Sequence, residues 1–351
     1  MVPDSCFCHP HVHSRNSMRD GLAHIEDLIA KAALLGQPGM ALTDHGVLFG
    51  MPDLFKAAKA WGIRAIGGME AYEAAVPWDF DMERDGAVFN VKWADLGDRH
   101  RYHHITLWAL DLTGWKNLVW LHTNSYRTEN HPTQRGKPLV SRKDLAEHSE
   151  GLMIGLGCIA SKTNQALIRD GEDAAYEQAR FYVDAVGDRC VMELMANTAD
   201  QVALLRGQRR VARRLGIECI GSNDVHYLDR KHGVENGAHH TLVKSRRFKK
   251  ADTEESGDKS DDGFGSWYGS DGFYLKSAAQ MMATGFEARD LTNTVDLLLS
   301  RVSFDFDALP APSPPTPQVP LLGDLPEFDA YCLSVYEDDA RARRMLDGLI
   351  A

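Results

Sequence analysis

The chain lacks any long uninterrupted apolar run, although apolar residues make up 44% of its 351 positions. Its longest apolar runs, such as 152–156, fall far short of the roughly 20 residues that cross a bilayer. The N-terminus has neither a basic region nor an apolar core of the kind that directs secretion. We therefore expect a globular cytoplasmic protein with no membrane partner, long enough for one large α/β domain or two ordinary ones.

Cysteine is scarce. In a chain without an export signal, thiols are expected to stay reduced, so each is buried or binds a metal. Cys6 and Cys8 are spaced too closely for a Cys-Xaa-Xaa-Cys zinc hook, and no second pair answers them, so we interpret both as structural. The six cysteines are Cys6, Cys8, Cys158, Cys190, Cys219 and Cys332.

Positive charge is in deficit, because 39 Lys and Arg residues face 50 Asp and Glu residues and the formal net charge is −11. This balance excludes a general polyanion binder, so any contact with nucleic acid must be local. The basic stretch 206–214 has apolar residues at helical spacing and indicates an ordinary helix with a solvated basic face. The stretch 244–250 has no such periodicity, and its Lys244, Arg246 and Arg247 are our candidates for holding a phosphate backbone.

The first 230 residues alternate short apolar runs with stretches of helical periodicity. Repeated strand-then-helix units predict a mostly parallel sheet or barrel with six or seven βα units. We expect strands over 6–12, 40–43, 64–67, 104–110, 152–156, 190–195 and 218–222, helices over 22–35, 53–61, 115–126, 173–186, 199–215 and 290–300, and a loop or hairpin over 76–101.

The last hundred residues change in composition. Residues 251–272 are rich in Ser, Asp and Gly and predict a mobile insertion. Seven prolines between 309 and 326 predict a stiff extended linker. We therefore divide the chain into a main domain over 1–300, a Pro-rich linker over 301–327 and an amphipathic C-terminal helix over 328–351.

The most informative feature is a set of nine side chains that can bind metal ions, most of which come just after an apolar run. His11 and His13 point to the same side of their strand because its side chains alternate with a period of two. Parallel α/β folds gather the carboxyl ends of their strands at one edge, so we expect the nine to converge. They are His11, His13, Asp20, His45, Glu70, His104, Cys158, Asp224 and His226.

The ligand types fit several divalent ions. Imidazole and thiolate suit zinc, whereas carboxylate with imidazole also suits manganese or iron. A carboxylate such as Glu70 can bridge two ions roughly 3.5 to 4 Å apart. Three carboxylates and one thiolate carry about −4, so three divalent ions would leave about +2 and favour a phosphate substrate.

Single members of the set have ordinary explanations. The His11-Val12-His13 pair alone could be a strand surface pair, and Asp44-His45-Gly46 alone could be a helix cap and turn. Cys158 alone could be a small buried residue. Only the complete set favours a metal site over these alternatives.

Short motifs surround the nine residues: His-Val-His-Ser at 11–14 with Ser17 and Asp20-Gly21, Leu-Thr-Asp-His-Gly at 42–46, Gly-Met-Glu-Ala-Tyr at 68–72, His-Ile-Thr-Leu at 104–107, Gly-Cys at 157–158 and Asn-Asp-Val-His-Tyr at 223–227. They resemble the motifs of the polymerase and histidinol phosphatase (PHP) domain. The resemblance is strongest to the version at the N-terminus of the bacterial or phage DNA polymerase III alpha subunit, because the stretches 112–118, 272–277 and 293–295 also resemble that subunit.

The resemblance implies a distorted (β/α)7 TIM-like barrel with three divalent ions, zinc, manganese or iron, in a bacterial or phage-infected cell. Every ligand position is filled here, which predicts a working site, with His9 as a candidate for its outer shell. Matching motifs imply that His11, His13, Glu70 and Asp224 hold one ion and the attacking metal-bound hydroxide, that Glu70, His104 and Cys158 hold a second ion, and that Asp20, His45 and His226 hold a third.

Three functions follow from this resemblance. The first is hydrolysis of DNA phosphodiesters, as a 3′–5′ exonuclease of the proofreading type acting on single strands or 3′ ends. The second is a non-catalytic scaffold, the N-terminal part of a DNA polymerase III alpha subunit whose helix 328–351 docks on replicative polymerase subunits. The third is a small-molecule phosphatase of the histidinol phosphatase type, against which the polymerase-like stretches count.

Overall fold

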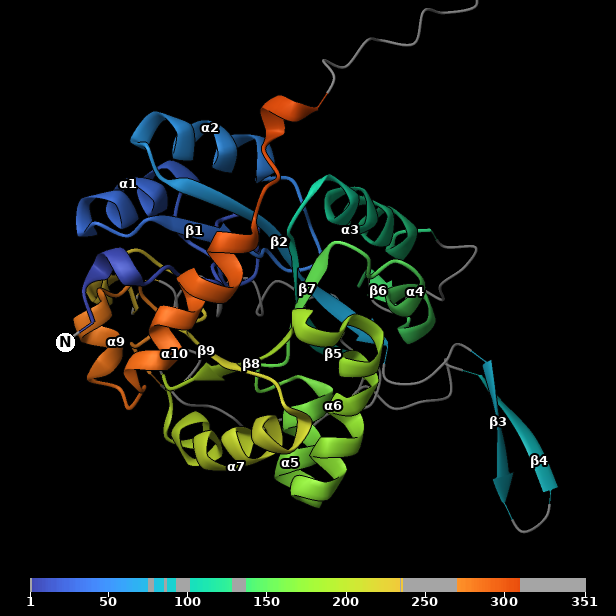
Figure 1. Ribbon diagram of the computed structural model, residues 1–351. Helices are drawn as coiled ribbons and strands as arrows, with labels where there is room; N and C mark the ends of the chain where they lie inside the picture. The colour runs from blue at the N-terminus through green and yellow to red at the C-terminus, as the bar shows by residue number, and fades with distance from the viewer. Residues whose placement is uncertain are drawn as a thin grey trace, which may run out of the picture. The chain divides into compact units, whose positions relative to one another are not determined.

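The computed structural model describes residues 2–74, 79–84, 87–92, 102–127, 137–233, 235 and 270–309. Seven of its strands form one curled sheet with helices around it, so the fold is mixed α/β as predicted (Figure 1). The strand order is β1-β2-β5-β7-β8-β9, with the short β6 paired to β2. The bounds are β1 Gly39–Leu42, β2 Arg64–Ala74, β5 Tyr102–Ala109, β6 Leu139–Val140, β7 Leu152–Gly155, β8 Cys190–Met195 and β9 Cys219–Ser222.

The sheet is less uniform than the predicted (β/α)7 barrel, because β5 runs antiparallel to both of its neighbours, β2 and β7. The other ladders, β1 with β2, β2 with β6, β7 with β8 and β8 with β9, are parallel. Between β2 and β5 the described chain forms an antiparallel hairpin of β3 Asp79–Arg84 and β4 Ala87–Lys92, within the range where the sequence predicted a loop or hairpin. A parallel neighbour needs a crossover connection, usually a helix, and this hairpin does not provide one.

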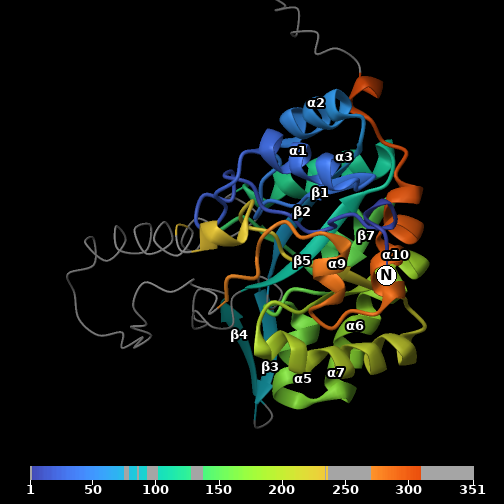
Figure 2. The same ribbon diagram turned by 90° about the vertical axis from the view of Figure 1, so that its left-hand side faces the viewer.

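The segment 9–13 contacts both edges of the sheet. Isolated parallel bridges pair His9 with Met40 of β1 and Val12 with Val225, beyond the end of β9. The sheet therefore curls so that β1 and the segment that follows β9 both pair with residues 9–13. Figure 2 shows the same ribbon turned by 90°, with β1, β2, β5 and β7 labelled. The predicted strand over 6–12 was wrong in form, since the chain makes a 3-10 turn at Asp4–Cys6 and then single bridges. Pro10, which has no N–H to donate, interrupts any regular ladder there.

Helices surround the sheet, with α1 and α2 on one side and α5, α6 and α7 on the opposite side (Figure 1). The predicted helix over 199–215 is confirmed, and its arginines pair with acidic groups, for example Arg210 with Glu172. The sequence missed α4 and α5, which begin after the capping serines Ser141 and Ser161. The bounds are α1 Ile25–Leu35, α2 Met51–Trp61, α3 Leu112–Ser125, α4 Arg142–Glu147, α5 Lys162–Asp170, α6 Glu172–Val186, α7 Ala199–Leu215, α9 Ala278–Met282 and α10 Ala288–Asn293.

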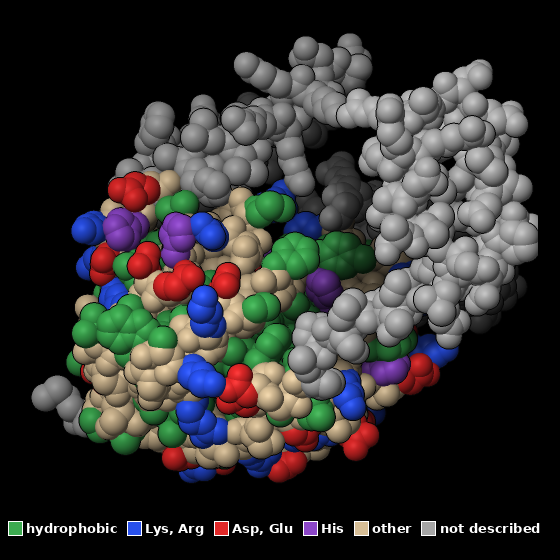
Figure 3. Space-filling model, turned by 90° about the horizontal axis from the view of Figure 1, so that it is seen from above, with side chains coloured by type: hydrophobic (Ala, Val, Ile, Leu, Met, Phe, Trp, Pro, Cys, Tyr) green, Lys and Arg blue, Asp and Glu red, His purple; other side chains and the backbone are tan. Residues whose placement is uncertain are grey.

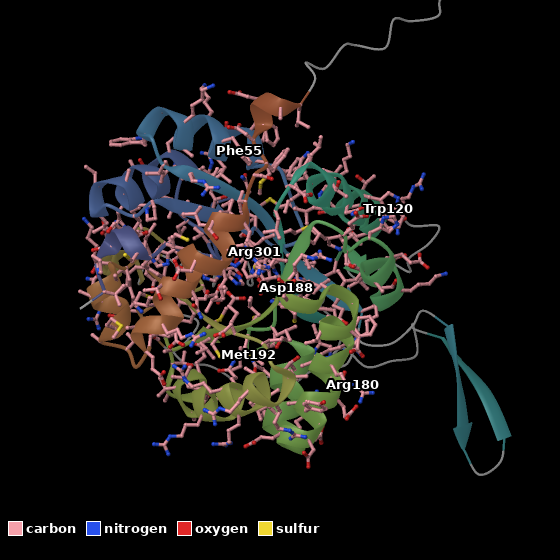
Figure 4. The ribbon with its side chains drawn as sticks, in the orientation of Figure 1. Phe55, Trp120, Arg180, Asp188, Met192 and Arg301 are labelled. Atoms are coloured by element: carbon pink, nitrogen blue, oxygen red, sulfur yellow. The ribbon has the colours of Figure 1, made fainter. Side chains whose placement is uncertain are left out.

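The stretch after α10 covers one end of the sheet interior. The helix predicted over 290–300 continues past α10 only as a π turn at Thr294–Leu298 and a 3-10 turn at Leu299–Arg301. Leu298 and Leu299 pack in the core cluster with residues from six strands. Arg301 forms an ion pair of 2.8 Å with Asp188, beside which it lies in Figure 4. The first compact unit runs to Phe306.

Several predictions fall outside the described residues. These are Lys244, Arg246 and Arg247, most of the insertion at 251–272, the proline-rich part of the linker and the helix over 328–351. None of the described helices is long and apolar enough to cross a bilayer. On the described part of the face in Figure 3, acidic and basic side chains interleave with apolar ones, in keeping with the acidic net charge.

Candidate metal centre

The bridge between the N-terminal segment and the segment beyond β9 brings four of the nine predicted ligands together. The Nε2 atoms of His11 and His13 lie 2.9 Å apart. The Oδ1 atom of Asp224 is 3.5 Å from the Nε2 atom of His11 and 3.3 Å from that of His13. The ring of His226 stacks on the ring of His13 with 4.5 Å between centroids. One pair of histidines and one aspartate–histidine pair, more than two hundred residues apart in the chain, thus share one pocket.

Glu70 lies at the middle of the cluster. Its Oε1 atom is 2.9 Å from Nδ1 of His104, and its Oε2 atom is 2.7 Å from Nδ1 of His45. The sequence placed Glu70 beyond a strand ending at Gly67, whereas β2 continues to Ala74 and Glu70 lies within it, opposite a residue of β5. β2 is longer than its apolar run because β5 and β6 both pair with its second half.

The remaining ligands complete the ring of contacts. The Oδ2 atom of Asp20 is 3.2 Å from Nε2 of His45, and the Sγ atom of Cys158 is 3.6 Å from Nδ1 of His104. The neighbouring His103 bonds instead to the carbonyl of Ala160 through its Nδ1 atom at 3.1 Å, so His104 is the histidine that enters the site. Each of the nine predicted residues therefore has a metal-binding atom that lies within 3.7 Å of a metal-binding atom of another member.

The carboxylates of the site are held ionised. Burial opposes ionisation of Glu70, but His104 and other imidazoles outweigh it and keep the pKa of Glu70 well below 4.5. Burial likewise opposes ionisation of Asp20 and Asp224, and nearby imidazoles, His45 first for Asp20, lower the pKa of both carboxyls. Three buried carboxylates in one pocket make it strongly attractive to cations.

The imidazoles and the thiol respond to the same charges. Burial would lower the pKa of His45, but Asp20 and Glu70 raise it to about 10. Burial lowers the pKa of His13 to about 3, with a further contribution from neighbouring imidazoles. Burial, and then the charge of Glu70, raise the pKa of the Cys158 thiol well above its ordinary value. In the absence of a cation the pocket therefore takes up protons to balance its carboxylates.

The residues fit a metal ion. The Oε2 atom of Glu70 lies 3.7 Å from Nε2 of His11 and 3.4 Å from Nε2 of His13, and the same two nitrogens lie 2.9 Å apart, so these three ligand atoms form one compact group. The Oδ1 atom of Asp224 contacts both nitrogens, at 3.5 Å and 3.3 Å. Ligands bound about 2.0 to 2.2 Å from an ion are roughly 3.0 to 3.6 Å apart. The Oδ1 atom of Asp224 is buried and makes no hydrogen bond within the described chain. The backbone of Asp224 also has a positive φ of 50°. Strain and an unsatisfied acceptor at one residue are typical of a ligand site.

Some residues that support the site were missed from the sequence. Glu193 of β8 is fully buried, and its Oε1 atom lies 2.8 Å from Nδ1 of His11. The Oγ atom of Ser17 lies 2.9 Å from Nδ1 of His13 and donates to Oδ1 of Asp44 at 2.8 Å. The signal for Glu193 was a carboxylate inside an otherwise apolar strand run. Asp44 is therefore more than the helix cap that its motif alone suggested.

His9 does not join the cluster. Its Nε2 atom bonds to the carbonyl of Lys276 at 2.8 Å, and its ring packs on that of Phe7 with 4.8 Å between centroids. Burial lowers the pKa of His9 to about 3, so it stays neutral. The prediction that His9 could belong to the outer shell of the site was wrong, because its side chain faces the segment around residue 276.

Known proteins resemble this chain. A family model described as PHP domain matches residues 9–197. The DNA polymerase III subunit alpha of Thermus aquaticus is 31% identical over 299 residues, which cover 83% of this chain and 22% of that protein. The corresponding subunit of Mycobacterium tuberculosis H37Rv is 32% identical, covering 79% of this chain and 22% of that protein. The chain thus spans about a fifth of the length of these relatives.

Among solved structures, one from Bifidobacterium adolescentis assigned to the metal-dependent phosphoesterases has a TM-score of 0.38 at 13% identity, covering 62% of this chain and 87% of that one. The family model covers more than half of the chain, from His9 to Asn197, and seven of the nine converging residues lie within it. The other two, Asp224 and His226, follow β9. The chain therefore belongs to the PHP domain family.

Proposed function

We propose that this protein is a metal-dependent phosphoesterase that hydrolyses phosphodiester bonds of DNA, with the 3′ end of a single strand as its substrate. The observation that carries the proposal is the convergence of nine ligand-type side chains around Glu70, at contacts of 3.7 Å or less. Membership in the PHP family supports a metal-dependent phosphoesterase. Similarity to replicative polymerase subunits supports the choice of DNA over a small phosphorylated metabolite.

The side chains would divide among three divalent ions. His11, His13, Glu70 and Asp224 would hold one, Glu70, His104 and Cys158 a second, and Asp20, His45 and His226 a third. Bound divalent ions would supply an activated water at neutral pH and stabilise negative charge on the phosphoryl oxygens. The mixed thiolate, imidazole and carboxylate set suits zinc, manganese or iron.

The protein's own groups then have separate tasks. His11 and His13 are fully buried, which excludes bulk water from one side of the pocket. His45 and His104 are only partly buried, with side-chain exposures of 12% and 18%, so the substrate would enter on their side. Lys244, Arg246 and Arg247, which lie outside the described residues, would hold the DNA backbone, a role that rests on the sequence alone.

Purified protein should release nucleotides from a 5′-labelled single-stranded oligonucleotide when Mn²⁺ or Zn²⁺ is added. A nitrophenyl phosphomonoester, assayed in parallel, separates DNA hydrolysis from small-molecule phosphatase activity. The control is the His11→Ala, His13→Ala double variant, which should be inactive, beside His24→Ala, which alters an exposed histidine at the start of α1. Absence of hydrolysis of both substrates under all metal conditions would rule the proposal out.

A second function is favoured by the same relatives. Because the chain matches only 22% of polymerase III alpha subunits, it could act as a structural partner of replicative polymerase subunits, with the metal ions stabilising the fold. In that case the protein would co-purify with a polymerase chain and bind metal, yet hydrolyse neither substrate. The assay above distinguishes the two functions.

A further inference from the structure

Glu193 is a buried carboxylate that sequence reasoning did not assign to the site. It lies in β8 with a fully buried side chain. Its Oε1 atom is 2.8 Å from Nδ1 of His11, and its Oε2 atom accepts the hydroxyl of Thr106 at 2.9 Å. A carboxylate is costly to bury without strong hydrogen bonds, so both oxygens have a partner. Both contacts lie on the side of His11 that faces away from the other ligands.

The neighbouring strand is shaped around this carboxylate. A Cβ atom on Gly155 of β7 would lie 2.5 Å from the ring of Trp108 and 2.9 Å from Oε2 of Glu193, and a Cβ atom on Gly157, just after β7, would lie 2.2 Å from the Cβ atom of Glu193. Real Cβ atoms do not approach other heavy atoms so closely. Glycine at both positions therefore lets Glu193 reach His11 without displacing β7.

The second histidine of the pair is held in the same way by different groups. The hydroxyl of Ser17 donates to Asp44, so its oxygen must accept from Nδ1 of His13. The proton of His13 is therefore on Nδ1, and its Nε2 atom can accept. His11 has a carboxylate in the corresponding place.

We propose that Glu193 is a positioning residue that keeps the imidazole proton of His11 on Nδ1, so that Nε2 is the atom available to a metal ion. Without an acceptor at Nδ1, the carboxylates of Glu70 and Asp224, 3.7 Å and 3.5 Å from Nε2, would draw the proton to Nε2 and block the site. Carboxylates that accept the second N–H of a metal-binding histidine fix its tautomer and ring orientation. This inference rests on the metal binding included in the proposed function, but not on hydrolysis.

The test compares two variants of Glu193. Glu193→Gln keeps an acceptor but removes the charge, and Glu193→Met removes both carboxylate oxygens at nearly the same volume, which leaves only the hydroxyl oxygen of Thr106, 3.3 Å from Nδ1 of His11. The control, Asp290→Asn, alters another buried carboxylate, which pairs with Arg209 outside the site at 2.6 Å. Thermal unfolding of each variant shows that it is folded before binding is measured.

The affinity for Mn²⁺, measured by competition with a chelating dye, should fall about 10- to 100-fold in Glu193→Met, less in Glu193→Gln, and not in Asp290→Asn. In ¹⁵N-histidine NMR, with or without Zn²⁺, the wild type should show a His11 Nδ1–H proton protected from exchange, and Glu193→Met should lose that protection. Wild-type affinity in a folded Glu193→Met, or an unchanged Nδ1–H signal, would overturn the proposal.

These readouts are independent of the proposed function. If the wild type binds Mn²⁺ but hydrolyses neither substrate, the phosphoesterase proposal fails, while the loss of affinity in Glu193→Met still supports the role of Glu193. If the wild type binds no metal, the inference fails together with the proposed metal site, and the NMR comparison of the metal-free proteins then shows only whether Glu193 holds the proton of His11 on Nδ1.

Discussion

Val12 and Val225 lie opposite each other in an isolated parallel bridge, more than two hundred residues apart in the chain. The residues on either side of each valine are four of the candidate ligands, and the contacts of His13 with Asp224 and His226 show that the side chains meet in one pocket. The backbone hydrogen bond from His13 N to Val225 O, 2.7 Å long, fixes the register of the two segments. A single backbone pairing thus sets the relative positions of His11, His13, Asp224 and His226.

His13→Ala should abolish tight binding of a metal ion at the site proposed for His11, His13, Glu70 and Asp224. The substitution removes one of these four ligands and leaves Asp224 without its nearest imidazole. We expect the affinity for Mn²⁺ to fall by at least about 10-fold. Titration with Mn²⁺, followed by calorimetry, measures this loss. His24→Ala, the exposed control, should bind as the wild type does, and an equal loss in both variants would contradict the assignment.

Cys158→Ala should weaken binding of Zn²⁺ and Cd²⁺ more than binding of Mn²⁺, because thiolate is a soft ligand that manganese does not favour. The matched control is Cys190→Ala, which removes a buried thiol from β8. Burial raises the pKa of the Cys190 thiol to about 12. Competition titrations with the three ions provide the comparison. Equal losses for all three ions in Cys158→Ala would mean that the thiol is not a ligand.

The ion pairs of Glu73 predict that the stability of the folded protein depends on pH for a reason that does not involve metal binding. It is buried between Arg142 and Lys162 at 2.8 Å and 3.0 Å, and although burial opposes ionisation, these cations lower the pKa of Glu73 below 4.5. A carboxyl with a lowered pKa in the folded state stabilises the protein above its unfolded pKa, and this contribution is lost as the pH falls through the folded value.

Glu73→Gln should therefore lower the free energy of unfolding by about 3 to 5 kcal/mol at pH 7, because it breaks a buried ion pair. The difference from the wild type should begin to shrink below about pH 4.5, where Glu73 becomes protonated in the unfolded chain, and should shrink further as the pH falls through its lower folded pKa. Urea unfolding between pH 3 and pH 7 measures both curves. A difference that stays constant over this range would show that the charge of Glu73 is unimportant.

Gly157→Ala should destabilise the protein by about 1 to 3 kcal/mol, because the new methyl group would overlap Glu193 and the strand must shift. Gly67→Ala is the control, since a Cβ atom there would meet its nearest neighbour, Met51, at an ordinary 3.5 Å. Urea midpoints of the two variants give the comparison. Equal stability would mean that β7 can move away from Glu193 at little cost.

Regular periodicity made some elements predictable. The strand 190–195 and the helix 199–215 were predicted with the bounds that β8 and α7 have. α7 begins after a Thr198 capping box and ends at Gly216 with φ of 70°, so its local signals agree with its tertiary packing. Elements whose ends are set by pairing partners were predicted less well, because β2 extends to Ala74 only through its ladders with β5 and β6.

The ligand set was recognisable because its motifs are local in sequence, and the structure brings all nine residues together. The groups that orient them were not recognisable, because their contacts join distant segments. Glu193 reaches His11 across 182 positions of the chain, and neither residue type alone indicates that contact. The antiparallel direction of β5 was missed for the same reason, since no periodicity distinguishes it from a parallel strand.

Anomalous diffraction from crystals soaked in Mn²⁺ tests the central claim most directly, because it locates bound ions without relying on activity. We predict anomalous peaks within bonding distance of Glu70, one bounded by His11, His13 and Asp224 and others toward His104 with Cys158 and toward His45 with Asp20. Peaks absent from this pocket, or present only at surface carboxylates, would contradict the account.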